Sequence, residues 1–331
     1  MKALQTFTLF SLGLFSLGFT GCEKISANAD SAKSSAAPLQ HLSIGYQKSA
    51  LNLLVARQQK LFEQQLPNVK VDWKEFPAGP QMLEALAVGA VDFGYVGNTP
   101  PIFAQAAGKD IRYVGYEVVT PNSQALVVPS GSPIQSLQDL KGKRIAVQKG
   151  SSAHELLGKV LKQAQLSWKD IQPIWLAPAE ARAAFDKNSI DAWVIWDPFL
   201  SAAKLDAQAQ VLIDGTAFPK SYAFYIGNPK FIQQHPHAVS KVLASLNAAD
   251  QWILQHQDQA LSIYTQSTGL APHIATPVFQ QRLKPSPIYP LNNQVIQSQQ
   301  HIANSFQQDQ LIPQSIKIQS VVWKDQHSIT P

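Results

Sequence analysis

The sequence of 331 residues contains a single cysteine, so no disulfide bond can form within the chain. Charged residues make up only 15% of it, and the net charge of +5 is spread along the chain without a dense run of Lys or Arg. Because nucleic-acid binding depends on clustered basic residues, the composition argues against a nucleic acid as partner. Beyond the N-terminus, no stretch reaches the ~20 apolar residues that a membrane-spanning helix requires.

The motifs of common enzyme classes are also missing. The sequence has no G-x-S-x-G motif, no Walker loop and no G-x-G-x-x-G motif. Its eight histidines are scattered without metal-ligand spacing, so we expect neither a metal nor another cofactor. Folding could still bring carboxylates together, although no sequence feature points to such a pair.

The first 40 residues do not resemble part of a globular fold. Residues 1–21 combine a basic start with an uncharged apolar run, which is typical of a signal peptide. The run ends at Cys22 in a pattern that resembles a bacterial lipobox, although Phe19 stands where leucine is usual. We predict lipidation at Cys22, with cleavage after Ala29 as the alternative. Residues 22–40 are rich in Ser and Ala and are predicted to form a flexible tether.

The most informative stretch, residues 78–108, predicts a helix, a strand, a turn and a second helix. Pro80 suits the first turn of a helix, and Val91–Val96 is rich in strand-forming residues. Thr99 is placed to cap the helix that begins at two prolines. Helix N-termini are therefore expected near Gly79 and Thr99. Their unpaired N–H groups and the helix dipole favour a small anion, although most such turns bind nothing.

Strand and helix patterns alternate along the chain, which indicates an α/β fold with mainly parallel sheets. With 45% hydrophobic residues, the chain can bury a sizeable core, and its length favours two lobes. Two parts of the sequence also resemble each other weakly. We give equal weight to a true structural repeat and to α/β patterns that arose independently. The matching segments are 44–49 with 145–150 and 78–92 with 177–191, including Asp92 and Asp191.

The strand ends of two such lobes can face each other across a cleft, since open α/β sheets bind ligands at the carboxyl ends of their strands. The C-terminal region predicts helices at about 229–233, 238–255, 258–265 and 295–307, and a strand at about 316–322. We assign this C-terminal region to packing and closure, because it shows no recognisable chemistry.

Six motifs stand out in the chain: GYQK (45–48), AGPQMLEAL (78–86), VDFGYVGNTPPIFAQAAG (91–108), DLKGKRIAVQKGSS (139–152), ARAAF (181–185) and DAWVIWDPFL (191–200). As a set they closely resemble aliphatic sulfonate-binding proteins, the periplasmic substrate-binding subunits of ABC importers. Relatives of that family bind taurine, nitrate or thiamine precursors. The resemblance covers about residues 41–240 in register.

The resemblance implies a type II periplasmic binding protein, with two α/β lobes, a ligand cleft between them and two hinge crossings. Lobe I is expected to comprise 41–124 and 226–331, and lobe II 125–225, with crossings near 123–129 and 221–227. It also implies a monomeric binding protein, not an enzyme, that delivers a small anionic ligand to a membrane permease. We expect a periplasmic location with a lipid anchor at Cys22.

A sulfonate is a permanently ionised tetrahedral anion, which neutral donors at helix N-termini can hold without a buried counter-charge. The predicted ligand-binding residues of this kind are Gln47, Gly79, Pro80, Gln81, Asn98, Thr99, Gly150, Ser151 and Ser152. Pro80 has no N–H, so Gly79 and Gln81 would act at that turn. Two alternatives stay open: Gly79 and Gly97 could serve turns at positive φ, and the two serines could only cap a helix.

The alkyl part of a sulfonate needs an apolar wall, because ligand clefts are lined mainly by apolar and aromatic side chains. The predicted wall residues are Tyr46, Tyr95, Trp196 and Phe224. Trp193 is expected in the core. Asp197 would repel a sulfonate and is expected to cap the next helix, unless the ligand carries an amine.

Other functions stay open on the sequence alone. The ligand could be taurine, nitrate, a thiamine-precursor pyrimidine, an arylsulfonate or a sulfate ester. The chain could also be an exported hydrolase or lyase on the same lobes, or a surface lipoprotein that binds no small ligand.

Overall fold

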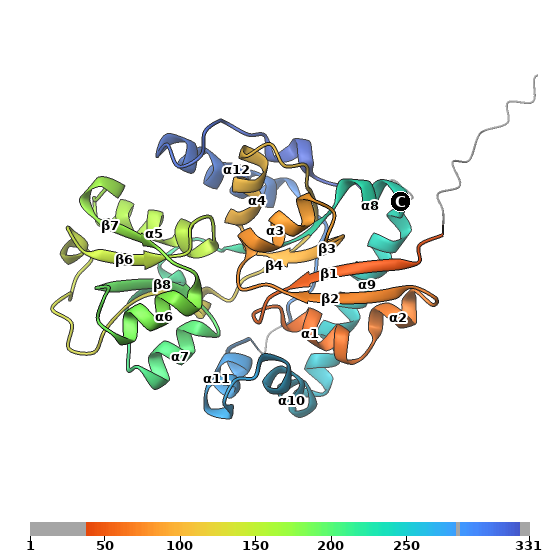
Figure 1. Ribbon diagram of the computed structural model, residues 1–331, viewed down its shortest axis with the longest axis horizontal. Coiled ribbons are helices and arrows are strands. Elements are labelled where there is room, and N and C mark those ends of the chain that lie inside the picture. Colours follow the sequence, from red (N-terminus) through yellow and green to blue (C-terminus); the bar gives the residue numbers. More distant parts are fainter. Residues whose placement is uncertain (1–37, 283–284, 325–331) are drawn as a thin grey trace, which may run out of the picture. The chain divides into compact units, whose positions relative to one another are not determined.

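The computed structural model describes residues 38–282 and 285–324 of the chain. The predicted signal peptide, the lipidation site Cys22 and residues 22–37 of the predicted tether lie outside the described residues. Within the described ranges the strands form two five-stranded sheets, each flanked by helices (Figure 1). This arrangement confirms the predicted α/β fold with two lobes.

The first sheet consists of β1 (His41–Tyr46), β2 (Lys70–Glu75), β3 (Phe93–Val96), β4 (Arg112–Val118) and β10 (Tyr222–Gly227). Its strand order is β2-β1-β3-β10-β4. Strand β1 pairs in parallel with β2 and β3, whereas β10 runs antiparallel between β3 and β4. Residues 222–225, which the sequence prediction assigned to lobe II, therefore pair within the first sheet.

The second sheet consists of β5 (Gln124–Val128), β6 (Arg144–Val147), β7 (Gln172–Trp175), β8 (Ala192–Trp196) and β9 (Gln210–Asp214). Its order, β7-β6-β8-β5-β9, repeats the topology of the first sheet, with β5 antiparallel between β8 and β9. The chain passes between the sheets twice, after β4 and after β9.

The matching aspartates of the sequence repeat occupy equivalent positions in the two sheets. The backbone N–H of Ser43 in β1 donates to Oδ2 of Asp92 at 2.8 Å, and that of Arg144 in β6 donates to Oδ2 of Asp191 at 2.7 Å. In return, each aspartate donates its own N–H to the carbonyl of the same partner, at 2.9 and 2.8 Å. The weak sequence repeat is therefore a structural repeat.

The helices that belong with the first sheet are α1 (Leu51–Gln58), α2 (Leu61–Gln65), α3 (Gly79–Ala87), α4 (Thr99–Ala106), α8 (Pro229–Gln234), α9 (Pro236–Gln255), α10 (Gln257–Thr268), α11 (Pro272–Arg282) and α12 (Asn293–Gln308). Those of the second sheet are α5 (Ser152–Gln163), α6 (Pro178–Asp186) and α7 (Phe199–Asp206). Short 3-10 turns are η1 (Pro121–Ser123), η2 (Gln138–Leu140), η3 (Trp168–Asp170), η4 (Gly215–Ala217) and η5 (Ile318–Val321).

Three element predictions differ from the structure. The sequence pattern of residues 50–66 predicts one helix, but the structure has two, because Lys60 adopts a left-handed backbone with φ of 53° between α1 and α2. The predicted strand at 316–322 is wrong: η5 occupies most of it, and Val322 makes only an isolated bridge to β4. Helix α11 was missed, because Pro277 lies inside it and interrupts the helical pattern.

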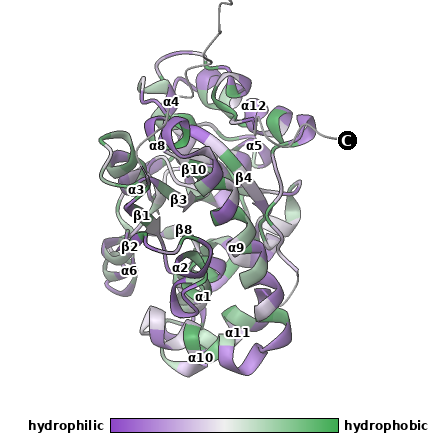
Figure 2. Cartoon of the chain, turned by 90° about the vertical axis from the view of Figure 1, so that its right-hand side faces the viewer, coloured by the Kyte–Doolittle hydropathy of each residue, from purple (hydrophilic) through white to green (hydrophobic). Residues whose placement is uncertain are grey.

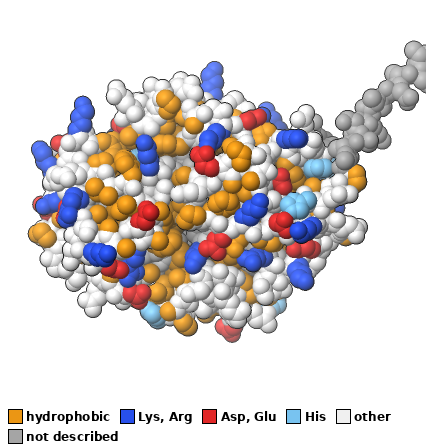
Figure 3. All heavy atoms as spheres, viewed as in Figure 1, with side chains coloured by type: hydrophobic (Ala, Val, Ile, Leu, Met, Phe, Trp, Pro, Cys, Tyr) orange, Lys and Arg blue, Asp and Glu red, His pale blue; other side chains and the backbone are white. Residues whose placement is uncertain are grey.

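Apolar side chains cover both faces of each sheet and supply the main stabilisation of the two lobes. Hydrophilic and hydrophobic residues alternate around the surface helices (Figure 2). Basic and acidic side chains are interspersed on the face shown in Figure 3, which agrees with the spread of charge along the sequence. None of the helices in the described ranges has the length and apolar character of a membrane span.

His154 in α5 sits where the second lobe packs against the first. Its ring centroid lies 5.5 Å from that of Phe103 in α4 and 5.1 Å from that of Phe306 in α12, and two tryptophans of its own lobe also pack on it. The imidazole is fully buried, its Nδ1 accepts the N–H of Gly150 at 3.2 Å, and its Nε2 has no partner in the part of the chain that the structure describes. Burial lowers the pKa of His154 to about 3, so the ring is neutral at working pH.

This neutral histidine should make the protein sensitive to acid. Below the usual histidine pKa of about 6.5, the unfolded chain binds a proton that the folded chain cannot, so stability falls by about 1.4 kcal/mol per pH unit until about pH 3. When the pH is lowered from 6.5 to 4.5, the unfolding free energy of the parent protein should fall by about 2–3 kcal/mol more than that of His154→Gln. Urea titrations at both pH values measure this difference. The control is His256→Gln, a variant of an exposed histidine, whose unfolding free energy should depend on pH as in the parent protein. The prediction would be contradicted if the unfolding free energies of all three proteins changed equally between the two pH values.

Candidate functional site

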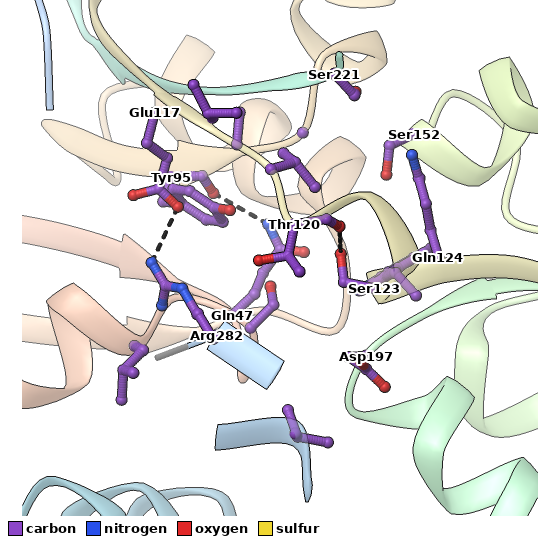
Figure 4. A pocket seen from close by; sticks show the side chains of 18 of the residues that line it. Gln47, Tyr95, Glu117, Thr120, Ser123, Gln124, Ser152, Asp197, Ser221 and Arg282 are labelled. Carbon is purple, nitrogen blue, oxygen red and sulfur yellow. Dashed lines mark hydrogen bonds and ion pairs between the residues drawn. The ribbon is translucent and has the colours of Figure 1, made fainter. Parts of the chain in front are cut away.

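A pocket opens between the two sheets, at the ends of β1, β3 and β8 (Figure 4). The first lobe lines it with residues that follow strands or begin helices, among them Gln47, Gly79, Gly97 and Pro100. The second lobe contributes Ser151, Ser152, Trp196 and Asp197, and the two crossings add Thr120, Ser123, Gln124 and Ser221. Since the carboxyl ends of strands are where open α/β sheets bind ligands, this pocket is the candidate site.

Two helices from different lobes begin at this pocket. Gly79 is the first residue of α3 and Ser152 the first residue of α5, so the backbone N–H of each has no partner inside its helix. No hydrogen bond of the Ser152 hydroxyl is found among the described residues. Uncharged donors from both lobes thus converge on one space, with the positive ends of two helix dipoles behind them.

The glycines at these turns permit close packing. A Cβ on Gly97 would lie 3.0 Å from Cβ of Ser152, and a Cβ on Gly79 would lie 2.6 Å from Pro100. Neither glycine has a positive φ, so the alternative that positive-φ turns explain them is wrong. The absence of a side chain at Gly97 lets the start of α5 reach the first lobe.

Two predicted donors beside Ser152 are already occupied. The N–H of Gly150 is bound by His154, and Gly150 does not line the pocket. Ser151 does line it, but its N–H and its hydroxyl both donate to the carbonyl of Gln148, at 3.2 and 2.7 Å. Ser151 holds the N-cap position of α5 without a capping bond from its side chain, so the capping alternative is not found there either.

Four further predicted residues lie outside the pocket lining: Pro80, Gln81, Asn98 and Thr99. Thr99 begins α4 instead of capping it, and its fully buried hydroxyl donates to Oδ1 of Asn98 at 2.9 Å. The amide of Asn98 donates in turn to the hydroxyl of Ser221 at 3.2 Å. These side chains therefore support the crossing next to the pocket. The Gln47 side chain does line the pocket, and its amide donates to the carbonyl of Tyr95 at 3.0 Å.

Of the residues predicted for the aromatic wall, Tyr95 and Trp196 line the pocket. Tyr46 and Phe224 do not line it and are buried in the cores of the first lobe. The Tyr46 hydroxyl accepts a hydrogen bond from Arg57 at 2.6 Å, and the Phe224 ring packs edge-on against Tyr113. Side chains alternate between the faces of a strand, and the pairing of these strands turns both rings away from the pocket.

Asp197 acts at the start of α7 as predicted. Its Oδ1 accepts hydrogen bonds from the N–H and the hydroxyl of Ser201, at 2.9 and 2.7 Å, while Oδ2 faces the side-chain amide of Gln281 at 3.4 Å. Burial raises the pKa of Asp197, and the bonds from Ser201 oppose this. Trp193 is in the core of the second lobe, also as predicted.

The sequence analysis missed the charged groups at the other end of the pocket. Arg282, the last residue of α11, donates to Oε1 of Glu117 at 3.1 Å, and the Tyr225 hydroxyl donates to Oε2 at 3.0 Å. Burial raises the pKa of Glu117 against the opposing effect of Arg282. Glu117 and Arg282 are 165 residues apart, so no local pattern could have paired them.

Helix α10, which the sequence analysis assigned to packing, and helix α11, which it missed, therefore form one end of the pocket. Besides Arg282 they contribute Tyr264 and Gln281. In Figure 4, Arg282 and Glu117 lie on one side of the pocket, and Ser152 and Gln124 on the other. Among the described residues no group of His, Cys, Asp and Glu is arranged to hold a metal ion.

A family model described as NMT1/THI5 like matches residues 47–260. The chain belongs to this family. The matched range includes the N-termini of α3 and α5 at the pocket, but it ends before Tyr264 and Arg282.

Relatives of known description match almost the whole chain. It is 41% identical over 312 residues to a protein of Escherichia coli (strain K12) named as an aliphatic sulfonates-binding protein, covering 94% of this chain and 96% of that one. A protein of Bacillus subtilis (strain 168) with the same description is 34% identical over 305 residues, covering 91% and 90%. Among solved structures, the alkanesulfonate-binding protein SsuA from Xanthomonas axonopodis pv. citri, bound to MOPS, has a TM-score of 0.84 and 43% identity, covering 87% and 99%.

The close approach at Gly97 should be essential for ligand binding. In Gly97→Ala the new methyl group would press on Ser152, and separating the lobes to relieve it should weaken ligand binding by roughly 1–3 kcal/mol. Titration calorimetry with an anion that binds the parent protein measures the change. The control is Gly158→Ala in the middle of α5, where a Cβ would make an ordinary contact at 3.6 Å. Undiminished affinity in Gly97→Ala would show that the lobes need not meet there.

Proposed function

We propose that this protein is the substrate-binding subunit of an ABC importer and captures aliphatic sulfonates in the periplasm. The observation that carries the proposal is the convergence of the α3 and α5 N-termini, one from each lobe, on a single pocket with uncharged donors. Family membership and relatives at 41% and 34% identity, both named as aliphatic sulfonates-binding proteins, support the same ligand class.

The chemistry of the ligand fits these donors. A sulfonate offers three acceptor oxygens and a charge that no working pH removes. The N–H groups of Gly79 and Ser152 and the hydroxyl of Ser152 can bind the oxygens, and the helix dipoles stabilise the charge. Glu117 and Arg282 neutralise each other, so the pocket holds an anion without a net buried positive charge. Tyr95 and Trp196 offer aromatic surface for an alkyl chain.

We further propose that the two lobes close on the ligand as rigid bodies, by bending at the crossings after β4 and β9. In this proposal the boundaries between the lobes lie near residues 124 and 221. Contacts that join the lobes beside the pocket include the His154 cluster, the ion pair of His273 in α11 with Asp206 in α7 at 2.8 Å, and the contact of Gln281 with Asp197. In this proposal the protein acts as a monomer, is anchored through a lipid on Cys22, and performs no catalysis.

A panel of anions tests the ligand class. Titration calorimetry should give binding heat with short alkanesulfonates, weaker heat or none with nitrate and sulfate, and no turnover in assays for released sulfite. The reason is that nitrate and sulfate have no alkyl chain to contact the apolar wall. Heat with nitrate or a pyrimidine alone would contradict the proposal, and sulfite release would indicate an enzyme.

The two serines at the start of α5 should behave differently on substitution. Ser152→Ala removes an unpaired hydroxyl and should weaken sulfonate binding by about 1.5–3 kcal/mol, the range for a hydrogen bond to a charged group. Ser151→Ala removes a hydroxyl that already donates to Gln148, so it should lower the unfolding free energy by about 1 kcal/mol with less effect on affinity. Calorimetry and thermal melting of both variants measure these effects. A larger loss of affinity in Ser151→Ala than in Ser152→Ala would place the ligand beside Ser151.

A further inference from the structure

The end of the pocket formed by α10 and α11 contains hydrogen-bonding groups without partners. Tyr264 is 3% exposed and lines the pocket, yet its hydroxyl has no partner within the described residues. Nη1 of Arg282 is likewise without a hydrogen bond there, while Nη2 of the same guanidinium binds Glu117. Buried polar groups are almost always paired, so two unpaired groups at one end of a binding pocket indicate that a partner comes from the ligand.

The groups around Tyr264 define the chemistry of that partner. Tyr264, Arg282 and Asp197 all line the pocket, and burial raises the pKa of the Tyr264 hydroxyl, so it keeps its proton and can donate a hydrogen bond. A guanidinium can only donate hydrogen bonds, and the ligand must therefore supply an acceptor to satisfy Nη1. A ligand ammonium group cannot accept a hydrogen bond and would face the charge of Arg282.

A second anionic group is also disfavoured here. The guanidinium of Arg282 is already paired with Glu117, and the carboxylate of Asp197 would oppose a ligand carboxylate. A neutral oxygen meets neither objection, since it accepts from Arg282 and Tyr264 and, as a hydroxyl, can donate to Oδ2 of Asp197. Among residues 38–282 and 285–324, that oxygen of Asp197 has only the long contact of 3.4 Å with Gln281.

We propose that the α10–α11 end of the pocket is a second subsite, which selects sulfonates that carry a hydroxyl group at the end of the alkyl chain opposite the sulfonate. This inference rests on the proposed function, because the sulfonate must occupy the end near Gly79 and Ser152 for its distal hydroxyl to reach Tyr264. Figure 4 shows the two ends on opposite sides of the pocket. The subsite separates hydroxyalkanesulfonates from plain alkanesulfonates and aminoalkanesulfonates of equal length.

The test is titration calorimetry with three matched ligands: propane-1-sulfonate, 3-hydroxypropane-1-sulfonate and 3-aminopropane-1-sulfonate, with the two- and four-carbon homologues of each. At the best-fitting length, the hydroxyl compound should bind at least about tenfold more tightly than the other two, as expected for a site with unpaired polar groups. Tyr264→Phe removes only the hydroxyl oxygen, and the ratio between the hydroxyl and the plain compound should fall toward one. The ratio should be unchanged in Tyr289→Phe, a half-exposed tyrosine outside the pocket.

The outcomes separate the subsite from the proposed function. Equal affinities for plain and hydroxyl compounds at every length would overturn the subsite and leave the sulfonate receptor intact. Tighter binding of the amino compound would also overturn it, and would assign recognition to Asp197. A hydroxyl preference that persists in Tyr264→Phe would overturn the role of Tyr264. Binding of none of the sulfonates would overturn the proposed function, and the subsite with it.

Discussion

The contact between Gly97 and the start of α5 is the constraint on which the site depends. Gly97 has no side chain, so Ser152 can approach the turn after β3, and the N-terminus of α5 then shares a pocket with the N-terminus of α3. Each helix start alone would be an ordinary turn, because unpaired N–H groups are common to all helices. Their meeting across two lobes creates a space that favours a small anion from two directions.

The buried charges of the pocket are arranged so that an anion can enter. Glu117 is held by Arg282 and by the hydroxyl of Tyr225, which leaves the pair neutral, and Asp197 is held by two donors of Ser201. An unpaired buried carboxylate would repel a sulfonate strongly, whereas a paired one mainly orders the side chains around it. Within the described residues, the Tyr264 hydroxyl and Nη1 of Arg282 have no partner at the α10–α11 end, and the Ser152 hydroxyl has none at the opposite end.

The lobes touch on both sides of the pocket through contacts of different character. The His154 cluster is built from aromatic rings, and its histidine is kept neutral by burial. The contact of α11 with α7 includes the ion pair of His273 and Asp206, whose side chains are partly exposed to water, so it contributes less than its geometry suggests. A ligand that binds between these contacts joins surfaces that already fit each other, which reduces the ordering cost of closure.

The sequence by itself determined the α/β class and the helix starts near Gly79 and Ser152, because these follow from periodicity, glycine and local hydrogen bonding. It left the repeat undecided, and the equivalent strand orders of the two sheets decided it. From the sequence, Gln47, Gly79, Ser152 and Trp196 were predicted at the ligand site, and all four line the pocket. Strand pairing decided that Tyr46 and Phe224 face the cores, and local hydrogen bonds decided that the N–H of Gly150 is used. Only the tertiary structure brought Tyr264 and Arg282 to the pocket beside Glu117, because a contact across 165 residues depends on the packing of whole helices and leaves no local pattern.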